Sequence, residues 1–204
     1  MKKKILIVII LSLILSGCSK NNLDSKWGPQ IDNLYWGMSK KDAEEYYTCT
    51  EEQQEVSPGI YYQSLKEPVL IYGIEMDVIL IFEENYGLTG VQGKFDEKSI
   101  EDLQNKLDAK LGDHKFSTLS IMWWSDLVSD CYDREQIERA YNKLYSDLFL
   151  PETFITGRLY SPLVSYKLFL SGKRKGTLVI DGSIYVYITD LISKYEKETN
   201  YEKE

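Results

Sequence analysis

From residue 74 to residue 83 the chain reads Ile74-Glu75-Met76-Asp77-Val78-Ile79-Leu80-Ile81-Phe82-Glu83. Apolar side chains occupy every second position, which is the period of a β-strand with one face turned toward a core. Glu84-Asn85-Tyr86-Gly87 then supplies turn residues, and a second β-rich run extends from Leu88 to Phe95. The two runs predict an antiparallel pair of strands joined by a short turn.

Helical patterns and further β-rich runs surround this pair. Apolar residues recur every three or four positions over 39–49, 99–111 and 134–150, and a short helix is expected after Thr189. The other β-rich runs lie at 59–65, 116–124, 163–170, 177–180 and 183–188. Asp181-Gly182 separates the last two runs. Such a pair predicts a type I′ hairpin, because that turn needs a positive φ at two successive residues.

The order of the elements is helix, three strands and helix, and it recurs after the strand at 116–124. It predicts an α+β fold with an antiparallel sheet and four helices, arranged as two similar halves at 34–115 and 130–196. We expect a single domain over 34–196, followed by a charged, frayed tail at 197–204.

Residues 1–17 have the pattern of an export signal. Lys2, Lys3 and Lys4 form a positive segment, and an apolar run follows from Ile5 to Leu15. The run is shorter than the roughly 20 residues that a permanent membrane-spanning helix needs. We therefore expect a signal peptide that is removed from the mature protein.

Leu15-Ser16-Gly17-Cys18 resembles the lipobox of bacterial lipoproteins. The resemblance implies that a diacylglycerol is attached to the Cys18 thiol and that the leader is cut before Cys18. The protein would then be anchored by lipid on the extracytoplasmic face of the cell membrane, or of the outer membrane in a diderm host. Residues 18–33 are expected to be a flexible tether. The alternative is an ordinary signal peptide with a chance cysteine at its end.

The charge of the chain excludes one class of partner. The net charge is −8, and removal of the three lysines of the leader takes it to −11. Phosphate backbones are bound by clustered lysine and arginine, so we expect no nucleic-acid partner. The same acidity argues against a domain that lies flat on anionic lipid.

Cys49 and Cys131 are the two cysteines that follow the lipobox. In an exported domain such a pair can be a disulfide, and closing a loop of this size would contribute roughly 4 kcal/mol. Two separate buried thiols fit the sequence equally well, because spacing along the chain does not give the geometry.

The sequence contains no recognisable catalytic motif. His114 is the single histidine, and no Gly-x-Ser-x-Gly elbow accompanies it. A Cys-x-x-Cys pair, a histidine cluster and a glycine-rich phosphate loop are all absent from the sequence. We expect no catalytic residues, no metal and no cofactor.

Aromatic residues are the unusual feature of the composition. The chain has 16 tyrosines and 4 tryptophans, and several stand in adjacent pairs. Neighbouring residues of a strand point to opposite faces, so Trp123 and Trp124 cannot share a core, and nor can Tyr61 and Tyr62. Either helices cover both faces of the sheet, or one face carries an exposed aromatic binding surface near these four residues.

Tyr35-Trp36-Gly37-Met38-Ser39-Lys40-Lys41-Asp42 is similar to the opening of several small bacterial lipoprotein domains, in which Gly-Met-Ser or Gly-Met-Thr caps a first helix. Outer-membrane-assembly lipoproteins of the BamE/SmpA type and the β-lactamase-inhibitor-protein fold use this plan. The resemblance extends to the element order of 34–95 and departs from the family at Glu44-Glu45-Tyr46-Tyr47-Thr48-Cys49. It implies a binding or scaffold role without catalysis.

These features predict a lipid-anchored lipoprotein that acts as a non-enzymatic binding or scaffold module in the cell envelope. Its partners would be the membrane, through the diacylglycerol on Cys18, and an envelope protein or a glycan. The alternative is a cell-envelope hydrolase or the glycan-binding subunit of an enzyme. That alternative requires two carboxylates about 5–9 Å apart in a cleft lined by aromatic side chains.

Overall fold

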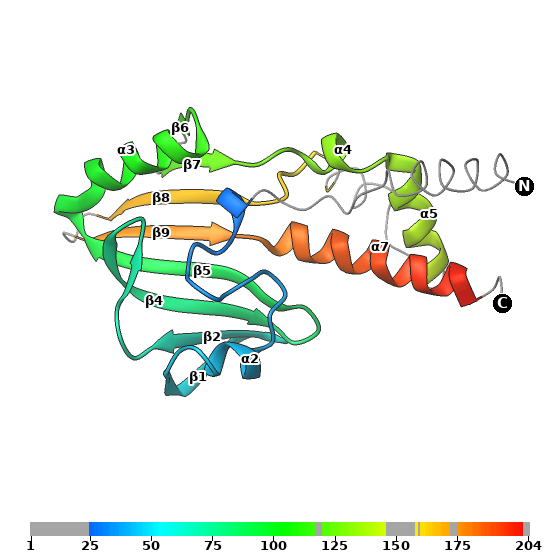
Figure 1. The fold of residues 1–204 in the computed structure, drawn as a ribbon, viewed down its shortest axis with the longest axis horizontal. Coiled ribbons are helices and arrows are strands. Elements are labelled where there is room, and N and C mark those ends of the chain that lie inside the picture. Colours follow the sequence, from blue (N-terminus) through cyan, green and yellow to red (C-terminus); the bar gives the residue numbers. More distant parts are fainter. Residues whose placement is uncertain (1–24, 117–119, 146–157, 159, 172–174, 202–204) are drawn as a thin grey trace, which may run out of the picture.

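The computed structural model describes residues 25–116, 120–145, 158, 160–171 and 175–201 (Figure 1). The expected signal peptide, Cys18 and the first part of the expected tether lie outside these residues. The strands are β1 (Cys49–Ser57), β2 (Ile60–Leu65), β3 (Val69–Ile71), β4 (Ile74–Glu83), β5 (Gly87–Asp96), β6 (Lys115–Phe116), β7 (Ser120–Trp124), β8 (Ser165–Ser171) and β9 (Lys175–Asp181). The helices are η1 (Ser25–Trp27), α2 (Lys40–Glu44), η2 (Glu97–Ser99), α3 (Ile100–Leu111), α4 (Val128–Cys131), α5 (Arg134–Tyr145) and α7 (Ser183–Tyr201).

Nine strands form one sheet in the described part of the chain. Their order is β1-β2-β4-β5-β9-β8-β7-β6, all neighbours are antiparallel, and β3 pairs separately with β4. The strand pair predicted from residues 74–95 is present as β4 and β5, with Asp77 opposite Lys94 and Glu83 opposite Gly87.

The predicted division into two similar helix–strand halves is wrong, although the α+β class holds. β5 from the first part of the chain pairs directly with β9 from the last part, from Gly90 opposite Asp181 to Asp96 opposite Lys175. This pairing satisfies the free hydrogen-bonding edge of β5, which would be exposed in an isolated half. One continuous sheet therefore dominates the fold, with most of its helices at the margins.

One face of the sheet carries the main hydrophobic core. On β4, Met76, Val78 and Leu80 are at most 2 % exposed, while the residues between them are exposed or half-buried. The buried row continues across β5, β9, β8 and β7, because paired residues of neighbouring strands face the same side. Side chains from the amino-terminal segment, α2 and α3 complete this core: Trp27, Ile31, Leu34, Trp36, Met38, Ala43, Leu103 and Leu107.

The folded domain begins earlier than predicted. Trp27 and Ile31 are only 7 % and 4 % exposed and pack into the main core. The Tyr166 hydroxyl on β8 donates a hydrogen bond to the Gly28 carbonyl at 2.6 Å, and the Tyr166 ring stacks edge-on against Trp27. Residues 25–33, which were expected to be tether, therefore belong to the domain. Their burial depends on single side chains in a one-turn helix and the loop after it, which leave no periodic pattern in the sequence.

The hairpin predicted at Asp181-Gly182 is also wrong, because a helix follows these residues. β9 ends at Asp181, and α7 continues from it away from the sheet (Figure 1). The Asp181 carboxylate accepts a hydrogen bond from the Ser183 N–H at 3.0 Å, which supplies a partner to a free donor at the start of the helix. A Cβ on Gly182 would lie 2.5 Å from the Trp36 ring, so this glycine serves close packing. α7 also contains residues 197–201, which were expected to fray.

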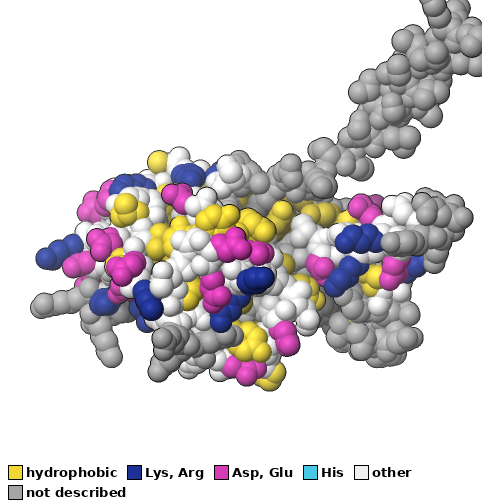
Figure 2. Space-filling view, turned by 60° about the horizontal axis from the view of Figure 1, so that its bottom comes forward, with side chains coloured by type: hydrophobic (Ala, Val, Ile, Leu, Met, Phe, Trp, Pro, Cys, Tyr) yellow, Lys and Arg dark blue, Asp and Glu magenta, His cyan; other side chains and the backbone are white. Residues whose placement is uncertain are grey.

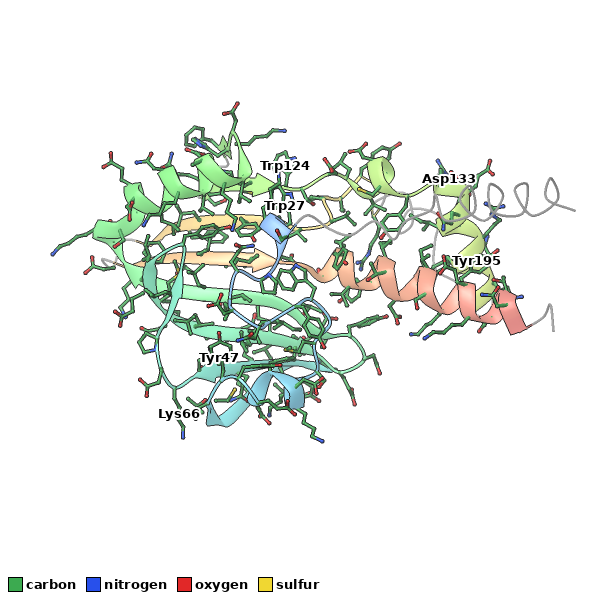
Figure 3. All side chains as sticks on the ribbon, viewed as in Figure 1. Trp27, Tyr47, Lys66, Trp124, Asp133 and Tyr195 are labelled. Atoms are coloured by element: carbon green, nitrogen blue, oxygen red, sulfur yellow. The ribbon has the colours of Figure 1, made fainter. Side chains whose placement is uncertain are left out.

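A second, smaller core lies between α4, α5 and α7. Its buried members are Val128, Ile137, Ala140, Tyr141, Leu163, Ile188, Leu191 and Ile192, and Tyr195 packs against them (Figure 3). Tyr185, near the start of α7, contacts both cores.

The other predicted helices are present with different lengths. α3 matches the prediction for 99–111, and α5 starts at the predicted position, Arg134. Residues 146–150 of that prediction lie outside the described part. α2 has only 5 residues, but the predicted cap is confirmed: the Asp42 N–H donates to the Ser39 hydroxyl oxygen at 3.1 Å.

Candidate functional site

The two tryptophans of β7 point to opposite faces of the sheet, as strand alternation requires. Trp123 is 1 % exposed in the main core, and its indole N–H donates to Asp108 Oδ1 on α3 at 2.9 Å. Trp124 is half-buried on the other face, where the Lys115 ammonium lies 4.0 Å from its ring centre (Figure 3). Trp123 therefore cannot belong to an exposed binding surface, whereas Trp124 can.

Tyr61 and Tyr62 are divided between the two faces in the same way. Pairing across the strands places the following residues in one row: Tyr62, Ile81, Gly90, Asp181, Ser165 and Trp124. We call this side of the sheet the open face. Its half-buried aromatic and aliphatic side chains belong to neither core of the described residues: Tyr62, Ile79, Ile81, Val179 and Trp124. The predicted aromatic surface is thus reduced to Trp124 and Tyr62.

Tyr61 lies on the core side and lines a cleft of about 680 Å³. Four segments of the chain form this cleft: the loop that leads into α2, Tyr61 on β2, the end of β4 with the turn that follows it, and α7 from Val186 to Ser193. The lining residues are Trp36, Gly37, Ser39, Lys40, Tyr61, Phe82, Glu83, Glu84, Asn85, Tyr86, Gly87, Val186, Thr189, Asp190 and Ser193. We call it the turn cleft. Its volume is in the range of roughly 300–1,000 Å³ that ligand pockets occupy.

Two backbone hydrogen bonds fix the wall of the turn cleft. The Gly37 N–H donates to the Leu88 carbonyl and the Leu88 N–H donates to the Met38 carbonyl, both at 2.8 Å. Gly87 makes this close approach feasible, because its φ is +73° and a Cβ there would lie 2.5 Å from the carbonyl oxygens of Gly37 and Met38. The loop before α2 is therefore held against the end of the hairpin.

Tyr187 joins α7 to the turn at the edge of the cleft. Its hydroxyl donates a hydrogen bond to the Glu83 carboxylate, and its ring packs edge-on against Tyr86 with centroids 4.5 Å apart. The Arg158 guanidinium lies 4.9 Å from the centre of the Tyr187 ring. Burial, followed by the hydrogen bond to Glu83 and the charge of Glu83, raises the pKa of Tyr187 well above its ordinary value. The phenol therefore stays protonated and remains a donor.

The turn cleft carries negative charge on an otherwise mixed surface. Glu84 is exposed, and no hydrogen bond or ion pair to its carboxylate occurs among the described residues. The charge of Glu55, followed by slight desolvation and the charge of Glu84, raises the pKa of Tyr61. Elsewhere, acidic and basic side chains are interspersed over the face shown in Figure 2.

Cys49 and Cys131 are each half-buried, and no disulfide joins them. Cys49 packs against the main core and Cys131 against the second core, so they lie in different parts of the domain. Burial raises the pKa of both thiols, and the charges of Glu44 and Asp126 add to the effect at Cys49 and Cys131 respectively. The structure thus agrees with the alternative of two separate thiols.

His114 is held by contacts with α3 and with two aromatic side chains. Its Nδ1 lies 2.8 Å from Asp108 Oδ1, the same oxygen that accepts the Trp123 indole N–H, and its ring stacks edge-on against Phe116 and Trp123. Within the described ranges there is no group of three or more side chains suited to holding a metal ion. The helices described here also include none with the length and apolar character needed to cross a membrane.

The turn cleft was not predicted from the sequence. Trp36 and the Glu84–Gly87 turn were each recognised as local features, but nothing in their patterns indicates that they meet α7 in space. Residues 183–188 were predicted to be a hairpin strand, so the contribution of α7 to the cleft was not predicted either. Comparison with protein-family models, with curated proteins and with solved structures finds no match to this chain.

Proposed function

We propose that this chain is a lipid-anchored extracytoplasmic lipoprotein that acts as a non-enzymatic binding module of the cell envelope and holds its ligand in the turn cleft. The main support is the combination of aromatic and polar side chains that line one cleft from four segments. Aromatic side chains provide large contact areas with few rotatable bonds, which is why they dominate binding hot spots. The ligand would be an envelope protein or a glycan.

The lipobox and the start of the folded domain support a position close to the membrane. Six residues separate Cys18 from Ser25, the first residue of η1. The seven Cα–Cα steps from Cys18 to Ser25 reach at most about 25 Å when fully extended. A lipid on Cys18 would therefore keep the domain within reach of membrane-associated partners.

A photo-crosslinking experiment in intact cells tests the binding function. A photoreactive amino acid replaces Asn85, which is exposed in the turn cleft, and the matched control replaces Asn105, which is exposed on α3. We expect a discrete adduct from position 85 that is absent from position 105. Adducts that are missing at 85, or equal at both positions, would contradict a binding role for the cleft.

A cell-envelope hydrolase is the second candidate, because three acidic residues, Glu83, Glu84 and Asp190, line the cleft. Glycoside hydrolysis needs one carboxyl group as an acid and another as nucleophile or base. Here Glu83 accepts a hydrogen bond from Tyr187, Asp190 pairs with Lys194 at 2.6 Å, and Glu84 is exposed. None of the three has the sequestered setting typical of a general acid, so we favour binding. Release of sugar from cell-wall fragments by the wild type, lost in Glu83→Gln, would reverse this preference.

A further inference from the structure

We propose that the group recognised in the turn cleft is a cation: the ammonium or guanidinium group of a basic side chain on an extended peptide segment. This inference rests on the proposed binding function and specifies the chemistry of its ligand.

The cleft offers hydrogen-bond acceptors that its own residues do not use up. The Glu84 carboxylate has no hydrogen-bond or ion-pair partner in the described ranges. A ligand that supplies several N–H donors and a positive charge would complement the Glu84 carboxylate.

One lysine, Lys40, lines the cleft itself and a second, Lys194, lies next to it, and each is paired with an acid of its own helix. Lys40 pairs with Glu44 at 3.7 Å across one turn of α2, and Lys194 pairs with Asp190 at 2.6 Å across one turn of α7. No ion pair between either ammonium and Glu84 occurs among the described residues. The negative charge near the cleft also acts on Tyr61. The charge of Glu55, slight desolvation and the charge of Glu84 raise the pKa of its phenol.

The aromatic walls suit a cation as well. A cation within about 6 Å of an aromatic ring centre is attracted to its face. Arg158 already stands at 4.9 Å from the Tyr187 ring, which in turn packs against Tyr86 of the cleft wall. The cluster at the edge of the cleft thus accommodates a guanidinium from the chain itself. Tyr61 and Tyr86, both half-buried, supply further rings to a ligand that enters the cleft, whereas Trp36 is buried in the main core.

The volume of the cleft favours a side chain on a peptide over a small free ion. At about 680 Å³ it has the size of a site for a drug-sized ligand, which exceeds what one ammonium group fills. A free polyamine carries the same chemistry without a peptide backbone, and it is therefore included as a separate arm of the test.

The test measures binding to the full chain, purified in a nonionic detergent. The probe is a fluorescently labelled tetralysine peptide, followed by anisotropy, and the comparisons are the same peptide with acetylated side chains, spermidine and an uncharged tetramer of N-acetylglucosamine. We expect tetralysine to bind at least about tenfold more tightly than the acetylated peptide, because acetylation removes the charge. Its affinity should also fall with added salt, since the site is open to solvent.

Two variants with the same chemical change locate the site. Glu84→Gln should weaken tetralysine binding about fivefold, the effect of one solvent-exposed ion pair. Glu97→Gln changes an exposed acid on η2, at the other end of β5 and roughly 30 Å away at about 3.3 Å per residue, and should leave binding unchanged.

Other results would overturn the inference in distinct ways. Equal binding of the charged and acetylated peptides, or binding of the glycan alone, would show that the recognised group is not a cation. Equal effects of Glu84→Gln and Glu97→Gln would show that the charge acts over the whole surface and not in the cleft. Tighter binding of spermidine than of tetralysine would show that the ligand is a free polyamine and not a peptide. An adduct from position 85 in cells would preserve the binding function in each case, whereas its absence would remove the function as well.

Discussion

At the scale of single residues, Gly87 decides whether the turn cleft can form. Alanine at this position would have to adopt a φ of +73° and would place its Cβ 2.5 Å from two carbonyl oxygens. We expect Gly87→Ala to lower the free energy of unfolding by more than about 2 kcal/mol, since strain and overpacking combine. Urea unfolding measures the loss.

Gly112 provides the matched control for this substitution. Its φ is +93°, but no atom lies within 4 Å of a Cβ built there, so Gly112→Ala adds backbone strain without a clash. We expect Gly112→Ala to lower the free energy of unfolding by about 1–2 kcal/mol, from backbone strain alone. Equal losses in the two variants would mean that the contact between the turn and the 37–38 backbone is not as tight as described.

Asp108 is a second residue whose replacement should lower the free energy of unfolding by a predictable amount. One of its oxygens accepts hydrogen bonds from both the buried Trp123 indole and His114. Asp108→Ala should therefore cost about 1–3 kcal/mol, the penalty for leaving a buried donor unsatisfied. Asp102→Ala removes an exposed pair with Lys106 on the same helix and should cost no more than about 0.5 kcal/mol. Chemical denaturation of both variants gives the comparison, and similar losses would contradict a special role for Asp108.

Residue orientation was only partly predictable from the sequence. Strand alternation correctly predicts that Trp123 and Trp124 face opposite sides, because the period of two is a property of the backbone. It cannot tell which of them is buried. That choice depends on α3, whose Asp108 lies within hydrogen-bonding distance of Trp123.

At the scale of elements, the boundary between β9 and α7 can be tested through Asp181. Its carboxylate accepts the Ser183 N–H at 3.0 Å. Asp181→Ala should destabilise the protein by about 1 kcal/mol, while Asp181→Ser, which retains an acceptor, should lose only part of this. Thermal unfolding followed by circular dichroism at a helical wavelength checks both variants. A loss that is identical for alanine and serine would argue against a capping interaction.

The same boundary shows why one element was predicted incorrectly. Ile184, Val186 and Ile188 alternate like a strand, but Ile184, Ile188, Leu191, Ile192 and Tyr195 also form a stripe of helical period. The helical stripe is the longer one, and burial against α5 in the second core stabilises it. β1 was not predicted at all, because Cys49–Ser57 is rich in Glu and Gln and has no apolar alternation. Its place at the edge of the sheet accounts for this composition, since edge strands are often charged.

At the scale of the whole molecule, buried tyrosines predict a loss of stability at alkaline pH. Burial, with smaller contributions from Tyr185 and Cys131, raises the pKa of Tyr132 from 10.0 to about 12. The folded protein therefore holds this proton more tightly than the unfolded chain does. The resulting contribution to stability is complete below pH 10 and is lost as the pH rises toward 12.

Tyr132→Phe should make the decline of the unfolding free energy between pH 10 and 12 shallower. Denaturant titrations at several pH values measure the slope. Tyr160→Phe, at a tyrosine that is 67 % exposed, serves as the control and should leave the slope unchanged. An identical slope in wild type and Tyr132→Phe would contradict the raised pKa.

Attachment to the membrane is the remaining prediction at this scale. The lipobox resemblance predicts that Cys18→Ala abolishes acylation and releases the protein from the membrane fraction. Metabolic labelling with a fatty acid and fractionation measure the two effects. The control is Cys49→Ala. Cys49 is half-buried in the domain, so the variant protein should keep its full fatty-acid label. Equal label on wild type and Cys18→Ala would exclude the lipid anchor.

α7 separates the turn cleft from the second core, and this position has a dynamic consequence. Val186, Thr189, Asp190 and Ser193 line the cleft, while Ile188, Leu191 and Ile192 fill the second core on the other side of the same helix. A ligand in the cleft binds only conformations in which α7 is folded, so it lowers the population of locally opened forms by mass action. α5 packs against α7, and its amide hydrogens would then exchange with solvent more slowly when the cleft is filled. Binding in the turn cleft would thus slow amide exchange in α5, a helix that the ligand does not touch, without any change of fold.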